Sequence, residues 1–393
     1  MIGFDTLGNL VVVAGDYPAP GHMSFVFVQQ LVHAMIGQGA TISVVAPQSI
    51  VHALVHREKL LPRHMTYQTG GGERYDVYRP YILTLGNSRL FSGVIKSLNN
   101  FFLSKVLRKI APNVVYAHFW SSAQLVCSYA KDNSIPVFVA CGEGDNALED
   151  MVRNTSRASL QSLSEIVKGV VSVSSENKRK CIEYKLINED SIGVFPNCVD
   201  IELFQRRDRH LSRQMIGAKD DDFVIAFVGG FIPRKGPDRL AQAVSAINDS
   251  SIKVMFIGKS FPGYPYDFDC PGILLKGPVD HDKLPDYLSA ADVFVLPTQN
   301  EGCCNAIVEA LALGLPVISS NRPFNNDILD DTNSIKIDPD DVSSITDAIL
   351  KMRNQPDLCQ KMGDVSLSRR EHYSVQDRAR RILSFIKAGT DRE

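Results

Sequence analysis

Short apolar runs alternate with amphipathic segments along most of this chain. Runs that are apolar throughout are typical of parallel strands buried on both faces. Segments 25–37, 305–314 and 375–388 instead repeat their apolar residues at helical spacing. The pattern predicts an α/β fold of doubly wound parallel sheets. The predicted strands are 9–14, 41–46, 114–117, 137–140, 169–173, 192–195, 223–229, 252–257, 293–296 and 316–319.

The strand–helix series is too long for one domain. With 393 residues, the chain exceeds the size at which a single core stops growing. A second series starts at 223–229, after the polar, basic stretch 204–214. We therefore expect two Rossmann-like units, one over 1–205 and one over 206–373.

Composition narrows the functional class. The net charge of −2 argues against a nucleic-acid binder. None of the eight cysteines forms a C-x-x-C pair, so they predict reduced thiols and no metal site.

No apolar run reaches membrane-spanning length and no signal peptide is evident, which predicts a cytoplasmic protein, or one attached to a membrane from the cytoplasmic side. The G-x-G-x-x-G and G-x-x-x-x-G-K-[S/T] motifs are absent, which disfavours nicotinamide dehydrogenases and P-loop hydrolases.

The most informative string is N-E-G-C-C-N-A-I-V-E, which carries Glu301 and Glu309 eight residues apart. Glu301 precedes the start of a predicted helix, and Glu309 lies one turn inside it, about 6 Å along the axis. The unpaired N–H groups of the first turn, at Cys304, Asn305 and Ala306, can bind the phosphates of a diphosphate. The two carboxylates can accept hydrogen bonds from sugar hydroxyls on either side.

A second string, F-V-G-G-F-I-P-R-K-G, ends the strand at 223–229 and precedes another helix. Gly229 and Gly230 allow the backbone to approach an anion closely. Arg234 and Lys235 can neutralise its charge.

These strings resemble the E-x7-E and G-R-x-x-x-x-K-G motifs of retaining glycosyltransferases with the GT-B architecture, the glycosyl transferases group 1 family. The resemblance implies that Glu301 contacts the donor sugar and Glu309 the ribose, and that neither a metal nor another cofactor is needed. It also implies that Lys235 grips the diphosphate, that Gly277 lies beside the nucleobase, and that the final helix, 374–393, crosses back onto the first domain. Gly230 stands where the family has arginine, and we expect Arg234 to supply the guanidinium.

The same resemblance extends to the first half of the chain. His118 matches a family histidine that is implied to approach the donor sugar. Gly21 stands where many members have two glycines, and His22 follows it. Glu143 and Asp145, at a later strand end, are candidates for contacts with acceptor hydroxyls. The alternative for His22, Glu143 and Asp145 is ordinary surface or loop polarity, and the alternative for His118 is a structural histidine whose polar atoms are satisfied within the fold. The resemblance also implies that 1–205 is the acceptor-side domain and 206–373 the donor domain.

Residues 79–110 contain no Asp or Glu but several cations among Phe, Leu, Val and Ile. A basic amphipathic stretch of this kind can lie on an anionic bilayer. The alternative is a packed helix with a solvated basic face. The cations are Arg79, Arg89, Lys96, Lys105, Arg108 and Lys109.

Together these features predict transfer of a hexose or related sugar from a nucleotide-diphosphate sugar to an acceptor hydroxyl, with retention at the anomeric carbon. The expected acceptor is a glycan or lipid-linked saccharide in polysaccharide or glycolipid assembly. His118, Lys235 and Glu301 are the candidate catalytic residues. Two alternatives stay open: a nucleotide-sugar epimerase or glycoside phosphorylase of the same architecture, and a non-catalytic sugar-nucleotide-binding subunit.

Overall fold

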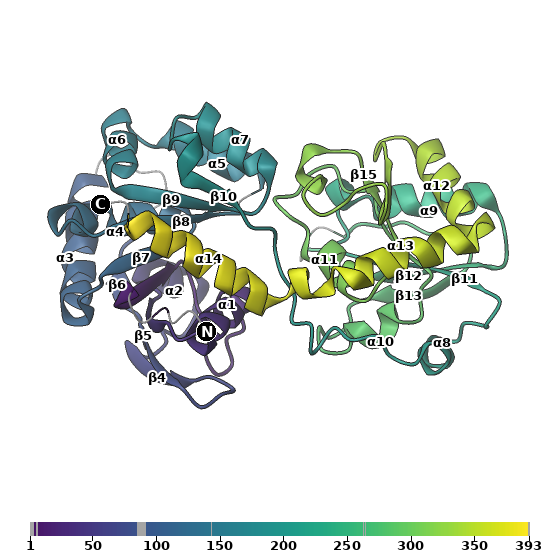
Figure 1. Ribbon diagram of the computed structural model, residues 1–393, viewed down its shortest axis with the longest axis horizontal. Helices are drawn as coiled ribbons and strands as arrows, with labels where there is room; N and C mark the ends of the chain where they lie inside the picture. The colour runs from purple at the N-terminus through teal and green to yellow at the C-terminus, as the bar shows by residue number, and fades with distance from the viewer. Residues whose placement is uncertain are drawn as a thin grey trace. The chain divides into compact units, whose positions relative to one another are not determined.

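The computed structural model describes Phe4 and residues 7–84, 92–142, 144–261, 263 and 265–391, without the side chains of Ser92, Asp145 and Asn146. The chain divides into two compact units (Figure 1). The amino-terminal unit comprises Met1–Val173, Asn177–Phe195 and Ala379–Glu393. The carboxyl-terminal unit comprises Ser174–Glu176 and Pro196–Arg378.

These boundaries differ from the sequence-based ones, since residues 196–205 and 374–378 belong to the carboxyl-terminal unit. Local hydrogen bonds explain the difference. Val199 donates to the Tyr373 carbonyl (2.8 Å) and accepts from the Val375 amide (3.1 Å). These two bonds join residues 196–205 to residues 374–378, so both segments lie in the carboxyl-terminal unit.

The amino-terminal unit contains an eight-stranded sheet of order β10-β9-β8-β7-β1-β2-β5-β4, parallel except for β4. A separate two-stranded sheet pairs β3 with β6. Its strands are β1 (Asn9–Ala14), β2 (Thr41–Val45), β3 (Gln48–Ser49), β4 (His64–Gln68), β5 (Arg74–Tyr78), β6 (Tyr81–Ile82), β7 (Val114–His118), β8 (Val137–Cys141), β9 (Val167–Ser172) and β10 (Ile192–Val194). The helices in this part of the chain are α1 (Val26–Gly37), α2 (Ile50–His56), α3 (Ser92–Ile110), α4 (Trp120–Asp132), α5 (Asp145–Asn154), α6 (Arg157–Ile166) and α7 (Ser175–Glu183).

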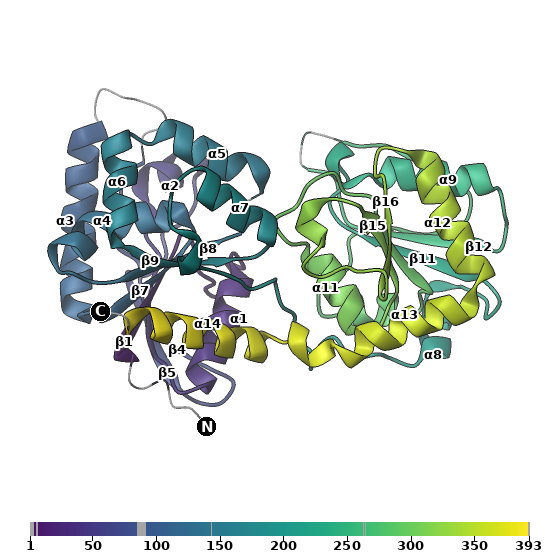
Figure 2. The ribbon, with the colours of Figure 1, turned by 45° about the horizontal axis from the view of Figure 1, so that its top comes forward.

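Alternate residues of β1 build two separate cores. Leu10 and Val12 pack with α1, whereas Val11 and Val13 pack with α3 and α4 on the opposite face (Figure 2). Because successive side chains of a strand point to opposite faces, a strand apolar at every position must be covered on both sides.

The last helix, α14 (Val375–Thr390), completes the first of these cores. Its residues Ile382, Leu383 and Ile386 are fully buried beside β1 and α1. The expectation that the final helix returns to the amino-terminal domain is therefore confirmed.

The carboxyl-terminal unit contains a six-stranded parallel sheet of order β13-β12-β11-β14-β15-β16, with helices on both faces (Figure 2). The predicted class, α/β with two doubly wound Rossmann-like units, is confirmed. Its strands are β11 (Phe223–Val228), β12 (Ile252–Ile257), β13 (Ile273–Gly277), β14 (Val293–Leu296), β15 (Val317–Ser320) and β16 (Ser334–Ile337). Its helices are α8 (Arg209–Ile216), α9 (Pro237–Ile247), α10 (Leu284–Leu288), α11 (Asn305–Ala312), α12 (Val342–Asn354) and α13 (Pro356–Ser368), with a short 3₁₀ turn at Pro233–Lys235.

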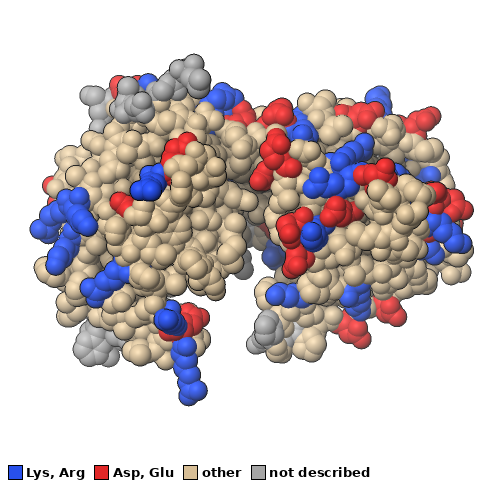
Figure 3. All heavy atoms as spheres, turned by 90° about the horizontal axis from the view of Figure 1, so that it is seen from below, with Lys and Arg blue, Asp and Glu red and all other residues tan. Residues whose placement is uncertain are grey.

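Charge is distributed differently on the two units. On the face drawn in Figure 3, Lys and Arg of the carboxyl-terminal unit are interspersed with Asp and Glu, while the amino-terminal unit shows wider uncharged stretches. None of the helices within the described ranges combines the length and the hydropathy required to cross a bilayer.

Candidate functional site

The two predicted donor strings meet at the topological switch point of the carboxyl-terminal sheet. β11 and β14 are neighbours there, although β12 and β13 lie between them in sequence. The loops that follow them, 229–236 and 297–304, are joined by a hydrogen bond from the Gln299 amide to the Arg234 carbonyl (2.9 Å). Ligands of doubly wound sheets bind at such a point, outside the carboxyl ends of the strands.

Gly236 permits the close approach of these loops. Its φ of 72° is left-handed, and a Cβ at this position would lie 2.7 Å from the Pro297 carbonyl oxygen. Arg239 occupies the remaining space and donates to the carbonyls of Pro233 (2.9 Å) and Pro297 (2.8 Å). A side chain at 236 would push the two loops apart.

Lys235, Glu301 and Arg234 form a cluster at the centre of this junction. The Glu301 Oε1 atom lies 2.5 Å from Lys235 Nζ and 3.1 Å from Arg234 Nη1, and it accepts from Thr298 Oγ1 at 2.8 Å. The side chains of Lys235 and Glu301 are only 15% and 12% exposed, whereas Arg234 is 44% exposed. Two cations therefore converge on one carboxylate in a largely desolvated setting.

The amino end of α11 borders this cluster. Cys304 is its N-cap residue, and the Cys304 Sγ atom lies 4.0 Å from Lys235 Nζ. Burial raises the pKa of Cys304 to about 11, so its thiol is neutral and does not oppose an anion. The Asn197 side chain donates to the Cys303 carbonyl (2.9 Å) and to Asn305 Oδ1 (2.8 Å), which fixes the helix start. The N–H groups at Asn305 and Ala306 lie in the first turn, where anions are stabilised.

Glu309 lies on α11 and is 9% exposed. Its Oε1 atom pairs with His281 Nε2 at 2.9 Å. The hydrogen bond to Glu309 raises the pKa of His281, and burial lowers it to a smaller extent. Sequence reasoning missed His281, which lies four residues after Gly277, the glycine expected beside the nucleobase; this proximity was the available signal.

The three candidate glycines also lie at the carboxyl edge of the sheet. Gly229 donates to the Ile257 carbonyl (2.9 Å), and the Gly277 carbonyl accepts from Gly258 (2.9 Å). A Cβ at Gly230 would have 4.0 Å of clearance to its nearest neighbour, the Lys259 carbonyl oxygen. Nothing in the described surroundings prevents a side chain at Gly230, so its departure from the family's arginine is not imposed by packing.

Among the amino-terminal candidates, His118 is the last residue of β7, and the turn carrying Gly21 and His22 follows the adjacent strand, β1. The His118 ring is buried, with a residue exposure of 5%, and its centroid lies 4.8 Å from that of Phe119 and 5.5 Å from that of Phe27. His118 is thus packed among aromatic rings, as a structural histidine would be. Its implied role at the donor sugar stays a prediction.

The His22 Nε2 atom lies within hydrogen-bonding distance of Asp16 Oδ2, at 2.7 Å. The Ala19–His22 segment is a tight turn with Gly21 at φ 78°. Glu143 lies outside the described residues, and Asp145 begins α5 with its side chain undescribed. The prediction of acceptor contacts by these two acidic residues stays untested.

The basic stretch 79–110 requires one correction. Arg79 is 1% exposed and its Nη2 atom donates to Tyr67 Oη (2.8 Å) and to the Pro18 carbonyl (3.0 Å). It belongs to the interior because it continues the inward-facing series Tyr75, Val77 after β5. Arg89 lies outside the described residues. The remaining cations, Lys96, Lys105, Arg108 and Lys109, are exposed on α3.

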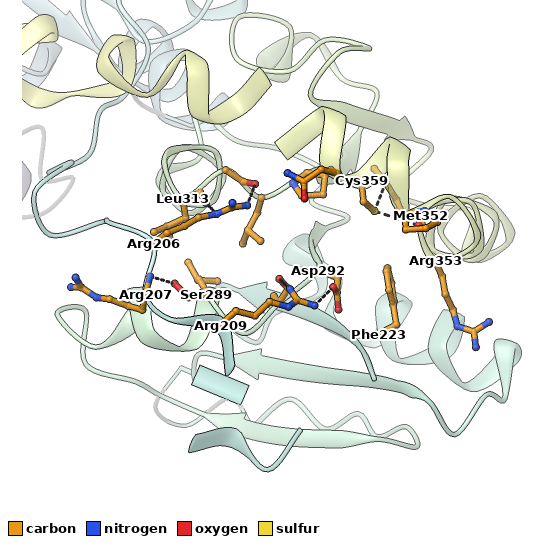
Figure 4. Close-up of a pocket in the computed structure, with 17 residues that line it drawn as sticks. Arg206, Arg207, Arg209, Phe223, Ser289, Asp292, Leu313, Met352, Arg353 and Cys359 are labelled. Atoms are coloured by element: carbon orange, nitrogen blue, oxygen red, sulfur yellow. Dashed lines mark hydrogen bonds and ion pairs between the residues drawn. The ribbon is translucent and has the colours of Figure 1, made fainter. Parts of the chain in front are cut away.

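A cavity of the carboxyl-terminal unit, of about 450 Å³, lies at the opposite, amino ends of the strands (Figure 4). Its arginines are already bonded. Arg206 donates to the Leu313 carbonyl (2.8 Å), Arg209 pairs with Asp292 (2.5 Å), and Arg353 pairs with Asp249 (2.7 Å). These bonds join residues 206–209 to the end of α11 and to the residue before β14, and they join α12 to the loop before β12. The arginines therefore serve the packing of the unit. No metal-binding group of three or more His, Cys, Asp or Glu side chains occurs within the described part of the chain.

Residues 222–355, which include Arg234, Lys235 and Glu301, match a known family. That family is described as Glycosyl transferases group 1. The chain is also similar over 268 residues to the UDP-Gal:alpha-D-GlcNAc-diphosphoundecaprenol alpha-1,3-galactosyltransferase of Escherichia coli, with 28% identity, 64% of this chain and 68% of that protein being covered. A putative teichuronic acid biosynthesis glycosyltransferase, TuaC of Bacillus subtilis, is 23% identical over 289 residues, which are 71% of each chain.

Comparison with solved structures covers both units. HepE of Anabaena, solved in complex with UDP, aligns with 97% of this chain and 100% of its own, with a TM-score of 0.74 and 13% identity. At this identity the similarity shows the fold, and that fold is the expected GT-B architecture. The resemblance found from the motifs and the one found from the coordinates therefore agree.

Proposed function

We propose that this protein is a retaining, metal-independent glycosyltransferase that moves a hexose or related sugar from a nucleotide-diphosphate sugar to an acceptor hydroxyl in polysaccharide or glycolipid assembly. The observation that carries the proposal is the pairing of Lys235 and Arg234 with Glu301 beside the amino end of α11. The family match over residues 222–355 and the names of the two relatives support glycosyl transfer.

The chemistry of each group follows from its position. Transfer requires that the negative charge of the leaving diphosphate be neutralised. Lys235, Arg234 and the N–H groups of α11 supply this neutralisation. Glu301 accepts from the sugar hydroxyls, and its desolvated setting strengthens those bonds. Glu309 accepts from the ribose after exchanging its bond with His281. No nucleophile is assigned. His118 retains its proposed role near the sugar as a prediction.

Binding and turnover test the proposal separately. The protein is screened by thermal shift against UDP-, GDP-, ADP- and dTDP-sugars, and the stabilising donor is then supplied with candidate acceptors. Glu301→Ala is expected to remain folded and to lose turnover. A wild-type protein that binds a donor but never transfers would support the non-catalytic subunit. Conversion of the donor without acceptor would support an epimerase, and an absorbance band from pyridoxal phosphate would support a phosphorylase. The anomeric configuration of the product, read by NMR, must be retained.

We further propose that α3 contacts an anionic membrane. Its residues Val94, Leu98 and Phe101 follow at spacings of four and three, so they form one stripe, and they are 63%, 40% and 61% exposed. Lys105 and Arg108 extend from the same helix. An apolar stripe beside cations fits the interface of an anionic bilayer, where each nearby cation contributes about 1 kcal/mol.

Sedimentation with vesicles of phosphatidylglycerol and phosphatidylcholine tests this contact. Binding at low salt that is lost with Phe101→Asp supports it. Leu211→Asp is the matched control, because Leu211 is 63% exposed on α8 of the other unit. Absence of sedimentation at low salt, or equal loss with both variants, would disprove the contact.

A further inference from the structure

Two thiols lie together inside the amino-terminal unit. Cys141 is the last residue of β8, and Cys181 lies on α7, 40 residues further along the chain. Their Sγ atoms are 3.5 Å apart, and both residues are fully buried in the core that also contains Val11 and Val13. A disulfide bond is about 2.05 Å long, so the two sulfur atoms would have to approach each other by about 1.5 Å.

The fold holds the two segments that carry these thiols side by side. β8 pairs with β9 in parallel, with Cys141 opposite Ser172, and the Val173 amide donates to the Cys141 carbonyl (3.0 Å). α7 begins at Ser175, directly after this pairing, so it starts beside the end of β8. Backbone hydrogen bonds and a short connection therefore set the distance between the thiols. The remaining approach can come from side-chain rotation and a small shift of α7.

The hydrogen bonds at this pair are asymmetric. The Cys181 thiol and the Asn177 side-chain amide both donate to Cys141 Sγ, at 3.5 and 3.8 Å. Donors directed at a sulfur atom stabilise its thiolate, and the thiolate is the form that attacks an oxidant. Cys141 is therefore suited to react first, and Cys181 lies where it can attack the oxidised product.

We propose that Cys141 and Cys181 form a reversible disulfide in the presence of hydrogen peroxide. The Cys141 thiolate attacks one oxygen atom, the O–O bond breaks, and the departing hydroxide takes up the Cys141 proton as water, which leaves a sulfenic acid. The Cys181 sulfur then attacks the Cys141 sulfur. The S–S bond forms, the S–O bond breaks, and the hydroxide leaves with the Cys181 proton as a second water. Two thiols lose two electrons, and one peroxide is reduced to two waters.

Burial of the pair selects the kind of oxidant. Hydrogen peroxide is uncharged and has two heavy atoms, so a small local opening of the unit admits it. Glutathione disulfide is large and charged, and the same opening does not admit it. Cys303 and Cys304 of the other unit do not compete, because burial raises their pKa values to about 12 and about 11 and keeps both thiols neutral.

The disulfide would stabilise the amino-terminal unit. It closes a loop between residues that are 40 positions apart, which lowers the entropy of the unfolded chain. We expect the midpoint of thermal unfolding to rise by about 5–10 °C on oxidation and to return after dithiothreitol. Cys141 also ends β8 at the carboxyl edge of the sheet, so the link would fix α7 at the edge where α/β sheets bind ligands. This inference goes beyond the proposed function and does not depend on it.

The test treats the full chain with hydrogen peroxide under native conditions. Remaining thiols are blocked with N-ethylmaleimide in denaturant, and disulfides are mapped by mass spectrometry. We expect a linked peptide pair that contains Cys141 and Cys181, formed by peroxide and not by the same concentration of glutathione disulfide. Cys181→Ser should instead accumulate a sulfenic acid at Cys141, trapped with dimedone, whereas Cys141→Ser should give little at Cys181. Thermal unfolding checks that the variants fold, and the wild-type map decides the question without them.

Cys127→Ser is the matched control. Cys127 lies on α4 and packs at the margin of the same core, and this variant should form the linked peptide as the wild type does. The proposal is overturned if peroxide gives no Cys141–Cys181 peptide in the wild type, or if the linked protein unfolds at the temperature of the reduced one. It is equally overturned if glutathione disulfide forms the link as fast as peroxide, if Cys127→Ser abolishes it, or if both serine variants yield equal sulfenic acid.

Discussion

Lys235 Nζ and Glu301 Oε1 lie 2.5 Å apart, although the two residues come from loops after different strands. Each is largely buried, so each would be costly to leave alone. In the proposed function, the lysine of this pair neutralises the diphosphate and the carboxylate accepts from a sugar hydroxyl. A donor phosphate can share the lysine charge without a large rearrangement, which is the arrangement expected of a preorganised site.

Lys235→Ala is expected to lower turnover by about 10²–10³-fold, because it removes a preorganised cation from the developing negative charge of the leaving group. Donor affinity should fall as well, since the lysine also neutralises the ground-state diphosphate. Steady-state kinetics with the identified donor and acceptor give both values.

Lys253→Ala provides the control for this substitution. Lys253 is in β12 of the same unit, and its Nζ atom donates to the Ser250 carbonyl (2.8 Å) at the amino end of the strand. This variant should leave the kinetics unchanged. Equal loss in both variants would point to a general effect of removing positive charge and would argue against a specific role for Lys235.

Arg234→Ala should weaken nucleotide binding about tenfold, the loss of one charge-assisted contact. In the double variant Gly230→Arg/Arg234→Ala, part of the affinity should return. A Cβ at Gly230 has 4.0 Å of clearance and the glycine does not have positive φ, so arginine can be accommodated. Isothermal titration with UDP measures each step. If the second substitution gives no recovery, Arg234 does not replace the family's arginine.

Gly236→Ala is expected to destabilise the carboxyl-terminal unit by about 2 kcal/mol or more, because left-handed backbone is costly for alanine and the new Cβ would meet the Pro297 carbonyl oxygen at 2.7 Å. Thermal unfolding should show a midpoint several degrees lower. Gly230→Ala is the matched control, and it should unfold at the wild-type temperature. A normal midpoint for Gly236→Ala would mean that the loops separate without cost.

The buried strands could be predicted because a strand that is apolar at every position must be buried on both faces. Asn9–Ala14, Ile252–Ile257 and Val293–Leu296 were placed with their observed boundaries. The edge strand β4 was missed, since its residues alternate between exposed and half-buried positions and contain no apolar run. Strands that lie at the edge of a sheet lack one neighbour and therefore lack the composition that identifies central strands.

The site residues also divide into those that local sequence predicted and those that it did not. The position of Lys235 and Glu301 in loops after strands could be predicted, because their spacing from the strand ends is local information; their roles in binding stay predictions. The partners His281 and Asp16 were missed because pairing with Glu309 and His22 depends on tertiary packing. Arg79 was assigned to a basic surface on composition alone. Tyr75, Val77 and Arg79 follow one another at a spacing of two residues, which indicates that all three side chains point to the buried face of the strand. The periodicity of a neighbouring strand should therefore be considered before a run of charges is assigned to the surface.

The pair of His281 and Glu309 predicts a pH-dependent contribution to stability. Hydrogen bonding to Glu309 raises the pKa of His281 above its ordinary value, against a smaller opposing effect of burial. A raised pKa in the folded state means that the stabilisation is fully present below the unfolded pKa, near 6.5, and is lost as the pH rises through the folded value. His281→Gln should therefore lower the unfolding midpoint at pH 5.5 and have little effect at pH 9. The effect should be small, because the histidine side chain is 58% exposed.

Glu309→Gln supplies the second arm of this experiment, because it removes the carboxylate that raises the pKa of His281. In a protein that already carries Glu309→Gln, adding His281→Gln should no longer change the unfolding midpoint at either pH. Thermal unfolding of the wild type, both single variants and the double variant at pH 5.5 and pH 9 measures the coupling directly. A pH-independent effect of His281→Gln, or one that persists when Glu309→Gln is present, would show that the ion pair does not stabilise the fold.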